Sequence, residues 1–166
     1  MKLDSKDIEI LKILQKNCRI TAKKIAEKID SPISTVYAKI KKMEESKIIL
    51  GYRAVLNAGK LGMGTTAFVL ASVAYRVPGI EEPLSQVEIA NKIALFPEVQ
   101  EVHIISGDWD LLIKVKASDV HEIGEFVVNK LRKVKGIEKT LTCMVFKTAK
   151  ETTEIPIFIK ALSKSW

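Results

Sequence analysis

The sequence predicts an α+β protein of two domains, in which a small helical domain precedes a larger domain of mixed strands and helices. The formal net charge of +7 lies entirely in residues 1–60, which hold 14 Lys and Arg against 7 Asp and Glu, so residues 61–166 are neutral. Apolar residues recur at helical spacing up to about residue 43 and alternate at strand spacing after Gly64. A length of 166 residues fits one medium domain or two small ones, and the change in charge near residues 59–64 favours two. We therefore expect a basic domain at residues 1–50, a linker at 51–64, a neutral domain at 65–148 and a tail at 149–166.

The first two helices of the basic domain are expected from their capping residues and their apolar faces. Asp4 is a residue type that caps helices, and the helix behind it should run to Lys16 and end at Asn17. Thr21 should cap the second helix in the same way. The residues that this second helix should bury are Ile25, Ala26 and Ile29.

A third helix is expected after the break at Asp30, with Ser31 as its N-cap. Pro32 then falls in the first turn, where the N–H that proline lacks would have no partner anyway. Apolar residues follow at intervals of 3, 4 and 3 and predict one buried face, made of Ile33, Val36, Ile40 and Met43.

The rest of this third helix carries the candidate DNA-contacting residues, which are Ser34, Thr35, Tyr37, Ala38, Lys39, Lys41 and Lys42. Short polar side chains at the start of the helix can reach base edges, and lysines further along can meet phosphates. Two helices joined by a tight turn, the second one basic, match a helix-turn-helix motif. A solvated lysine face on an ordinary helical bundle is the alternative. Turn, spacing and charge together favour double-stranded DNA as a partner.

The second domain shows the order β-α-β-β-α-β. Strands are expected at Thr65 to Arg76, 99–106, 111–117 and 137–147. One helix is marked by Val87, Ala90, Ile93 and Ala94; the other follows Asp119 and should bury Ile123, Phe126, Val127, Leu131 and Val134. This order predicts a ferredoxin-like fold, with both helices on one face of an antiparallel sheet. The other face would stay apolar, so we expect a second copy of the chain to cover it.

The segment Gly107-Asp108-Trp109-Asp110 falls between two predicted strands. A hairpin loop with a glycine and two aspartates offers backbone amides to a carboxylate and carboxylates to an ammonium group, and a free amino acid has both. By pattern alone, a plain hairpin turn is the stronger interpretation.

The basic domain resembles the DNA-binding half of the Lrp/AsnC (feast/famine) transcriptional regulators. The resemblance is carried by Leu3-Asp4, Asp7, Ile10-Leu11, Leu14-Gln15, Arg19-Ile20, Thr35-Val36, Ile49, Gly51 and Tyr52. Lys39 stands where the family usually has Arg, and Lys47 where it usually has Gly. The second domain is similar to the effector-binding half of the same family, so the resemblance extends from Leu3 to about Lys147.

This resemblance implies a winged-type helix-turn-helix domain and dimers that form through the sheets, from which the family can build tetramers or octamers. It also implies an amino-acid effector bound between dimers at the Gly-Asp-aromatic-Asp loop, where Gly107 and Asp108 would hold the α-groups and Trp109 would form a wall. The other candidate effector-binding residues are Ser106, Asp110, Thr140 and Thr142. For the tail at residues 150–157, a strand and an arm over a neighbouring subunit both remain open.

Other function classes receive less support from the residues. Neither His103 nor His121 lies in a catalytic motif, so we expect no enzyme, no cofactor beyond an amino-acid effector, and no metal. The start of the chain lacks the apolar core of a signal peptide and no apolar run could span a bilayer, which indicates a cytoplasmic protein without a membrane partner. Two alternatives remain: an architectural protein that coats DNA without choosing sequences, and an enzyme resembling the sirohaem decarboxylases, which share the fold family.

Overall fold

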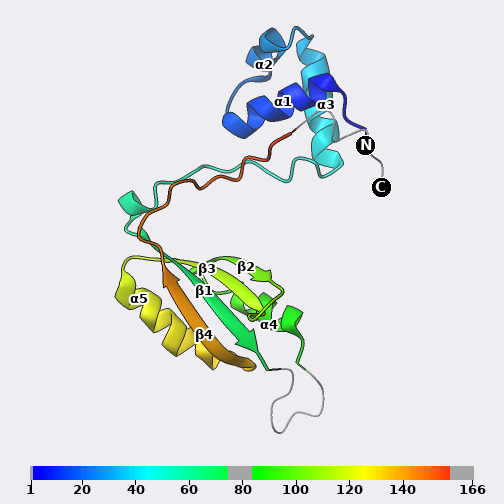
Figure 1. Ribbon diagram of the computed structural model, residues 1–166. Coiled ribbons are helices and arrows are strands. Elements are labelled where there is room, and N and C mark those ends of the chain that lie inside the picture. Colours follow the sequence, from blue (N-terminus) through cyan, green and yellow to red (C-terminus); the bar gives the residue numbers. More distant parts are fainter. Residues whose placement is uncertain (1, 75–83, 158–166) are drawn as a thin grey trace. The chain divides into compact units, whose positions relative to one another are not determined.

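The structure is a computed structural model that describes residues 2–74 and 84–157. The chain forms two compact units (Figure 1). The first, which we call the head, comprises residues 1–55 together with the tail from Lys150 onward, and the second, the body, comprises residues 56–149. Each unit is described by itself.

The head contains three helices, α1 (Ser5–Lys16), α2 (Ala22–Lys28) and α3 (Ile33–Glu45). Asp4 caps α1 in a reciprocal capping box, because its side chain accepts from the Asp7 N–H while the Asp7 side chain accepts from the Asp4 N–H. The Thr21 hydroxyl caps α2 by accepting from the Lys24 N–H. The predicted starts of both helices are therefore confirmed.

The expected start of α3 was wrong by one residue. Pro32 is the N-cap and no side chain caps this helix, because the Ser31 hydroxyl instead accepts from Lys6 Nζ at 2.6 Å. Ile33, which was expected on the buried face, is instead 43% exposed and lies outside the core. Val36 and Met43 are fully buried and Ile40 packs against them, so the rest of the predicted face is confirmed.

A left-handed residue ends the last helix of the head. Lys47 has φ 59°, although side chains with a Cβ avoid this region. The conformation lets the N–H groups of Ile48 and Ile49 both donate to the Met43 carbonyl, at 2.9 and 3.1 Å. Helix α3 thus ends in the left-handed conformation that glycine usually adopts after a helix, although the residue here is a lysine.

The body has four strands, β1 (Thr65–Val73), β2 (Val99–Ile104), β3 (Leu111–Ala117) and β4 (Ile137–Met144). They form one antiparallel sheet in the order β2-β3-β1-β4, as the ferredoxin-like prediction requires. A short 3₁₀ turn, η1 (Gly59–Leu61), precedes β1. The expected continuation of the first strand to Arg76 lies partly outside the described residues.

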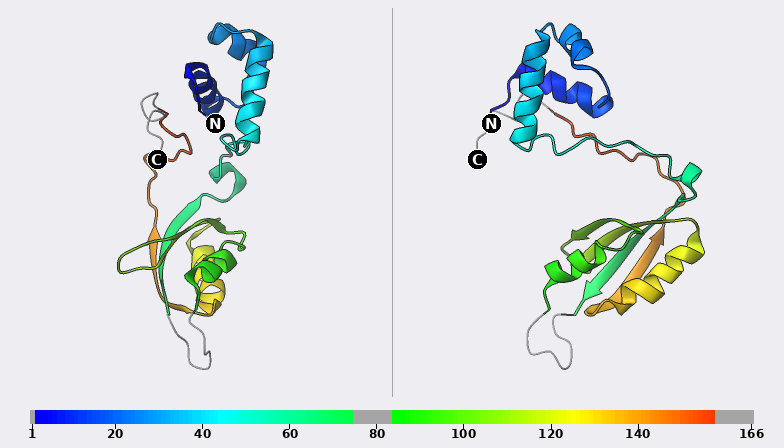
Figure 2. Two further views of the ribbon diagram at one scale, coloured as in Figure 1. Left: turned by 90° about the vertical axis from the view of Figure 1, so that its right-hand side faces the viewer. Right: turned by 180° about the vertical axis from the view of Figure 1, so that it is seen from behind.

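Two helices cover one face of this sheet, as Figure 2 shows. They are α4 (Gln86–Ile93) and α5 (Val120–Glu125), and α5 continues through a π turn at Phe126–Lys130 into a 3₁₀ turn at Leu131–Lys133. Beneath α5, the predicted core residues Ile123, Phe126, Val127 and Leu131 are buried, and Val134 is partly buried. The expectation for α4 needs correction: Val87 is 57% exposed and Ala94 is also exposed, because Ile89 and not Val87 faces the sheet.

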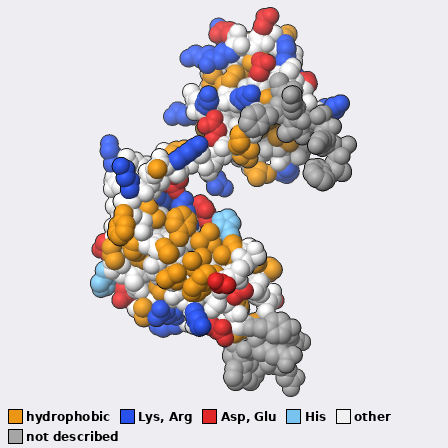
Figure 3. All heavy atoms as spheres, viewed as in Figure 1, with side chains coloured by type: hydrophobic (Ala, Val, Ile, Leu, Met, Phe, Trp, Pro, Cys, Tyr) orange, Lys and Arg blue, Asp and Glu red, His pale blue; other side chains and the backbone are white. Residues whose placement is uncertain are grey.

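The opposite face of the sheet is open within the described chain. Strand register places Leu70 opposite both Leu112 and Leu141, and Phe68 opposite Lys114 and Cys143, so these side chains share the open face. Figure 3 shows hydrophobic side chains gathered over this face. A charged pair lies on the same face, where Lys114 Nζ meets a Glu101 carboxylate oxygen at 3.1 Å. The predicted apolar and uncovered face is therefore present.

Gly136 lies in the tight turn between the helical segment of α5 and strand β4. Its φ is 99°, and a Cβ built there would lie 2.7 Å from the side chains of both Leu84 and Ile89. The positive φ, with these side chains so close, therefore favours glycine in this turn.

Because Lys47 holds a left-handed conformation, Lys47→Gly should stabilise the head by about 0.5–1 kcal/mol through relief of Cβ strain. Urea unfolding followed by circular dichroism measures the change. Lys47→Ala is the matched control, because it removes the same side chain yet keeps the Cβ, and it should leave the stability unchanged. A destabilised glycine variant would contradict the strain.

Candidate functional site

The exposed face of α3 presents most of the predicted DNA-contacting residues to solvent. Ser34, Tyr37 and Ala38 are exposed, Tyr37 by 63%, and Thr35 is half-buried. The helix can show this face because Val36 and Met43, on its other side, fill the head core. Small polar groups thus lie in the first turns of α3, with an aromatic ring among them.

Two of the three candidate lysines continue this exposed surface. Lys41 and Lys42 are both exposed. Lys41 lies 3.9 Å from Glu45 one turn further on, a contact that carries little energy between exposed groups. For Lys42, no ion pair is found within residues 2–74 and 84–157. Both ammonium groups are placed to meet an anion from outside.

Lys39 differs from its neighbours, and its expected role as a phosphate contact is not supported by its surroundings. Its Nζ lies 2.5 Å from an Asp4 carboxylate oxygen and 2.9 Å from an Asp7 oxygen, and its side chain is 20% exposed. Asp7 itself is only 3% exposed. Lys39 thus neutralises two carboxylates at the start of α1 and fixes α1 against α3.

The electrostatics of this contact support a structural role. The bond from Lys39 is the main cause that lowers the pKa of Asp4 below its usual 3.8. Burial alone would lower the pKa of Lys39, but its bonds to Asp4 and Asp7 outweigh burial and raise it. The Lys39 ammonium group therefore stays charged and is held against α1 by Asp4 and Asp7.

Lys6 is a head residue that the sequence reading did not single out. Its Nζ donates to the Asp30 carbonyl at 2.9 Å and to the Ser31 hydroxyl at 2.6 Å, and so joins α1 to the turn before α3. Asp30 takes a positive φ of 47° in this turn. No local pattern reveals the contact, because 24 residues separate Lys6 from Asp30.

The loop between β2 and β3 holds the candidate effector-binding residues 106–110. It is closed at its base where the Ile105 N–H donates to the Asp110 carbonyl at 2.8 Å. Ser106, Gly107 and Asp108 are exposed, and Gly107 has φ 116°, which a residue with a Cβ would adopt only under strain. Trp109 is half-buried. The tip of the loop therefore offers backbone amides and the Asp108 carboxylate to solvent.

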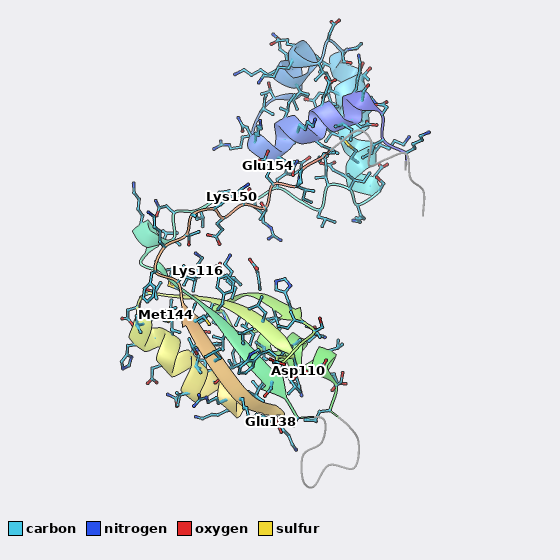
Figure 4. All side chains as sticks on the ribbon, in the orientation of Figure 1. Asp110, Lys116, Glu138, Met144, Lys150 and Glu154 are labelled. Atoms are coloured by element: carbon cyan, nitrogen blue, oxygen red, sulfur yellow. The ribbon has the colours of Figure 1, made fainter. Side chains whose placement is uncertain are left out.

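Asp110 has a different role from Asp108, because both of its carboxylate oxygens are already bonded. Oδ2 accepts from the Val73 N–H and Oδ1 from Gln86 Nε2, each at 2.7 Å. Its own N–H donates to the Ala71 carbonyl at 3.0 Å. Asp110, which is labelled in Figure 4, thus clamps the loop to the end of β1 and the start of α4.

The two candidate threonines lie on β4, away from the loop. Thr140 pairs with Ala71, which pairs with Leu111 directly after the loop, so Thr140 lies two strands across, about 10 Å away. Its hydroxyl accepts from Arg132 Nε at 3.0 Å. Thr142 lies two residues further along β4, opposite Val69, and is exposed. Within the body, strand pairing thus aligns Thr140 with the end of the loop across the sheet.

Residues 2–74 and 84–157 contain no group of three or more His, Cys, Asp and Glu side chains that could hold a metal ion. In the same residues, no helix has the length and apolar character to cross a membrane.

Comparison with known proteins agrees with both halves of this arrangement. Residues 3–49 match the family model for a winged helix-turn-helix DNA-binding domain, and residues 66–155 match that for the Lrp/AsnC ligand-binding domain. A helix-turn-helix-type transcriptional regulator from Pyrococcus furiosus is 41% identical over 149 residues, which are 90% of this chain and 96% of the relative.

Two solved structures show the same likeness over both units. A transcriptional regulator of Neisseria meningitidis in complex with L-Met has a TM-score of 0.84 and 27% identity, and covers 93% of this chain and 96% of its own. An AsnC-family regulator from Agrobacterium tumefaciens has a TM-score of 0.83 and 27% identity, with 93% and 97% covered.

The head and body together define a class of protein, a DNA-binding regulator with a separate ligand-binding domain. The chain belongs to the Lrp/AsnC family of transcriptional regulators, as its resemblance to that family indicated.

Lys39→Ala should destabilise the head by about 1–3 kcal/mol, because it leaves the buried Asp7 carboxylate without its cation. Lys42→Ala on the same helix is the matched control and should stay within about 0.5 kcal/mol of the wild type. Urea unfolding at neutral pH compares the two variants. Equal stability of both would contradict the structural role of Lys39.

The same contact predicts a pH dependence. Because the folded-state pKa of Asp4 is lowered, its stabilising contribution is present above the ordinary pKa of 3.8 and is lost as the pH falls below it. Wild-type stability should therefore fall more steeply than that of Lys39→Ala between about pH 4 and pH 2. Parallel curves from urea midpoints measured across this range would contradict the assignment.

Proposed function

We propose that this regulator reads DNA sequence with the exposed face of α3, acts as a homo-oligomer of at least two chains in the cytoplasm, and responds to an amino acid bound at the 106–110 loop. DNA reading by α3 is supported by the two different faces of this helix, one buried in the head core and one exposed. Val36 and Met43 anchor the helix, while Ser34, Thr35 and Tyr37 stand at its exposed start.

Base reading and phosphate binding fall to different residues in this proposal. Thr35 and Tyr37 can form hydrogen bonds with base edges in the major groove, and Lys41 and Lys42 follow where phosphates would lie. Lys39 is left out of the DNA contacts, because Asp4 and Asp7 already hold it.

Thr35→Ala or Tyr37→Ala should cost about 1–3 kcal/mol on the preferred duplex and little on random DNA, so that base preference relaxes. Lys42→Ala should weaken every duplex alike and reduce the slope of log affinity against log salt by about 1. Titrations of a selected duplex and of random duplex at several salt concentrations separate the two effects. If Thr35→Ala binds both duplexes unchanged, the proposed docking of α3 is wrong.

The open face of the sheet supports self-association. Leu70, Leu112 and Leu141 meet on this face with Phe68, and Lys114 already has Glu101 as its partner. A second copy of the same face could cover these apolar side chains. We propose a dimer through this face as the smallest assembly, with tetramers or octamers built from it.

The loop at 106–110 supports an amino-acid effector. Asp108 is exposed and the Gly107 amide lies in an open turn, so a carboxylate and an ammonium group could each find a partner there. The related Neisseria meningitidis regulator was solved in complex with L-Met, which favours an amino acid as the ligand class. Asp110 would shape the loop through Gln86 and Val73, and Thr140 would extend the site once a neighbouring subunit closes it.

An amino acid that binds this loop should change the assembly, and effector and DNA should alter each other's affinity by the same factor. Calorimetry and sedimentation with a panel of amino acids measure both effects. Asp108→Ala should lower effector affinity at least tenfold, because charge-assisted bonds to the ammonium group are lost. Glu138→Ala, on an exposed position of β4, is the control. No heat and no change in assembly with any amino acid would exclude the effector.

A further inference from the structure

The chain passes between its two units twice, once in the linker before β1 and once after β4 ends at Met144. The residues from Lys150 onward belong to the head unit (Figure 4). Residues 150–157 of the tail form no strand, and Ile155 contacts Gln15 in the head of its own chain. Of the two expectations for this segment, the strand is wrong, and the arm lies on its own subunit in this structure.

A single side chain of the head binds both polar groups of one tail residue. The Ile155 N–H donates to Gln15 Oε1 at 2.6 Å, and Gln15 Nε2 donates to the Ile155 carbonyl at 3.1 Å. A carboxamide offers one acceptor and one donor group side by side, so it can replace a neighbouring strand for one residue. Gln15 therefore fixes which residue of the tail lies against α1.

The apolar residues of the tail alternate in their exposure. Ile155 is 69% exposed, whereas Ile157 is half-buried and packs against the head core. Pro156 lies between them and biases Ile155 toward an extended backbone, so part of the docked conformation is favoured before contact. Proline also lacks an N–H that would need a partner at this position.

The small size of the head makes an additional apolar contact important for its stability. A domain of about 60 residues buries only ~60% of its unfolded surface, so additional apolar cover contributes noticeably to its stability. The exposed stretch 146–150 joins this contact to β4 without packing of its own. The tail therefore combines a docked end with an extended connection.

We propose that the surface around Gln15 on α1 is a peptide-docking site for residues 153–157 of the same chain, and that the docked tail is a second tether between head and body. Docking completes the head core through Ile157. The tether limits the freedom of each head, so that two heads of an assembly meet their half-sites at a lower cost in conformational entropy.

A crosslinking experiment tests whether the tail docks on its own head. The variant Lys12→Cys/Glu154→Cys, in a Cys18→Ser/Cys143→Ser background, places thiols on α1 and beside Ile155, for reaction with a bifunctional maleimide. We expect crosslinking within one chain, at least fivefold weaker when Gln15→Ala is added. A covalent dimer as the main product, or a crosslink indifferent to Gln15→Ala, would overturn docking on the same chain.

Hydrogen exchange of the helical amides in the head tests the contribution to the head core. Gln15→Ala and Ile157→Asp should each speed exchange by about 5–30-fold, the factor that 1–2 kcal/mol of lost stability produces. Ile155→Ala is the matched control, because it keeps both backbone groups that Gln15 binds and removes an exposed side chain; its exchange should stay within about twofold. Unchanged exchange in Gln15→Ala and Ile157→Asp would overturn the role in the core.

The tether is tested by six Gly and Ser residues inserted between Thr148 and Ala149, both of which are exposed. The insertion should leave head exchange unchanged but weaken binding to a duplex with two half-sites by about threefold or more, because a longer tether lowers the effective concentration of the second head. Binding to a single half-site is the control and should not change. Unchanged affinity for the two-site duplex would overturn the tether.

Discussion

The ion pairs of Lys39 with Asp4 and Asp7 hold together the part of the head on which DNA reading depends. The same two carboxylates cap α1 by binding each other's backbone N–H groups, so one cluster both starts α1 and fixes it to the middle of α3. Lys6 adds a second link from α1 to the turn before α3. With α3 held from two sides, the orientation of Thr35 and Tyr37 follows from the packing of the head and not from the DNA.

The body obeys a separate constraint, which is that both helices cover the same face of its sheet. The covered face carries the apolar core, and the open face keeps Phe68, Leu70, Leu112 and Leu141 in contact with solvent unless another chain covers them. The fold itself holds the 106–110 loop in place, because Asp110 bonds it to the end of β1 and the start of α4. What the loop lacks is a second wall, and assembly is the step that supplies one in our proposal.

Patterns within about four residues predicted most of the fold. The caps Asp4 and Thr21, the buried residues of α3 after Ile33, and the strand order followed from spacing and composition. What these patterns could not reveal are contacts between residues distant in sequence. The Ser31 hydroxyl binds Lys6 and does not cap α3, and Lys39 binds carboxylates 32 and 35 residues away. Gln15 likewise binds Ile155, which lies 140 residues further along the chain.

The central claim is that the head discriminates between DNA sequences, and one competition titration tests it most directly. Duplexes selected from a random pool would compete with bulk random DNA for the whole protein at about 0.15 M salt. Our account predicts a preference of about 10³-fold or more for the selected duplexes, which also yields the spacing of half-sites. Tight binding without preference would contradict it and would point to a protein that coats DNA through phosphate contacts alone.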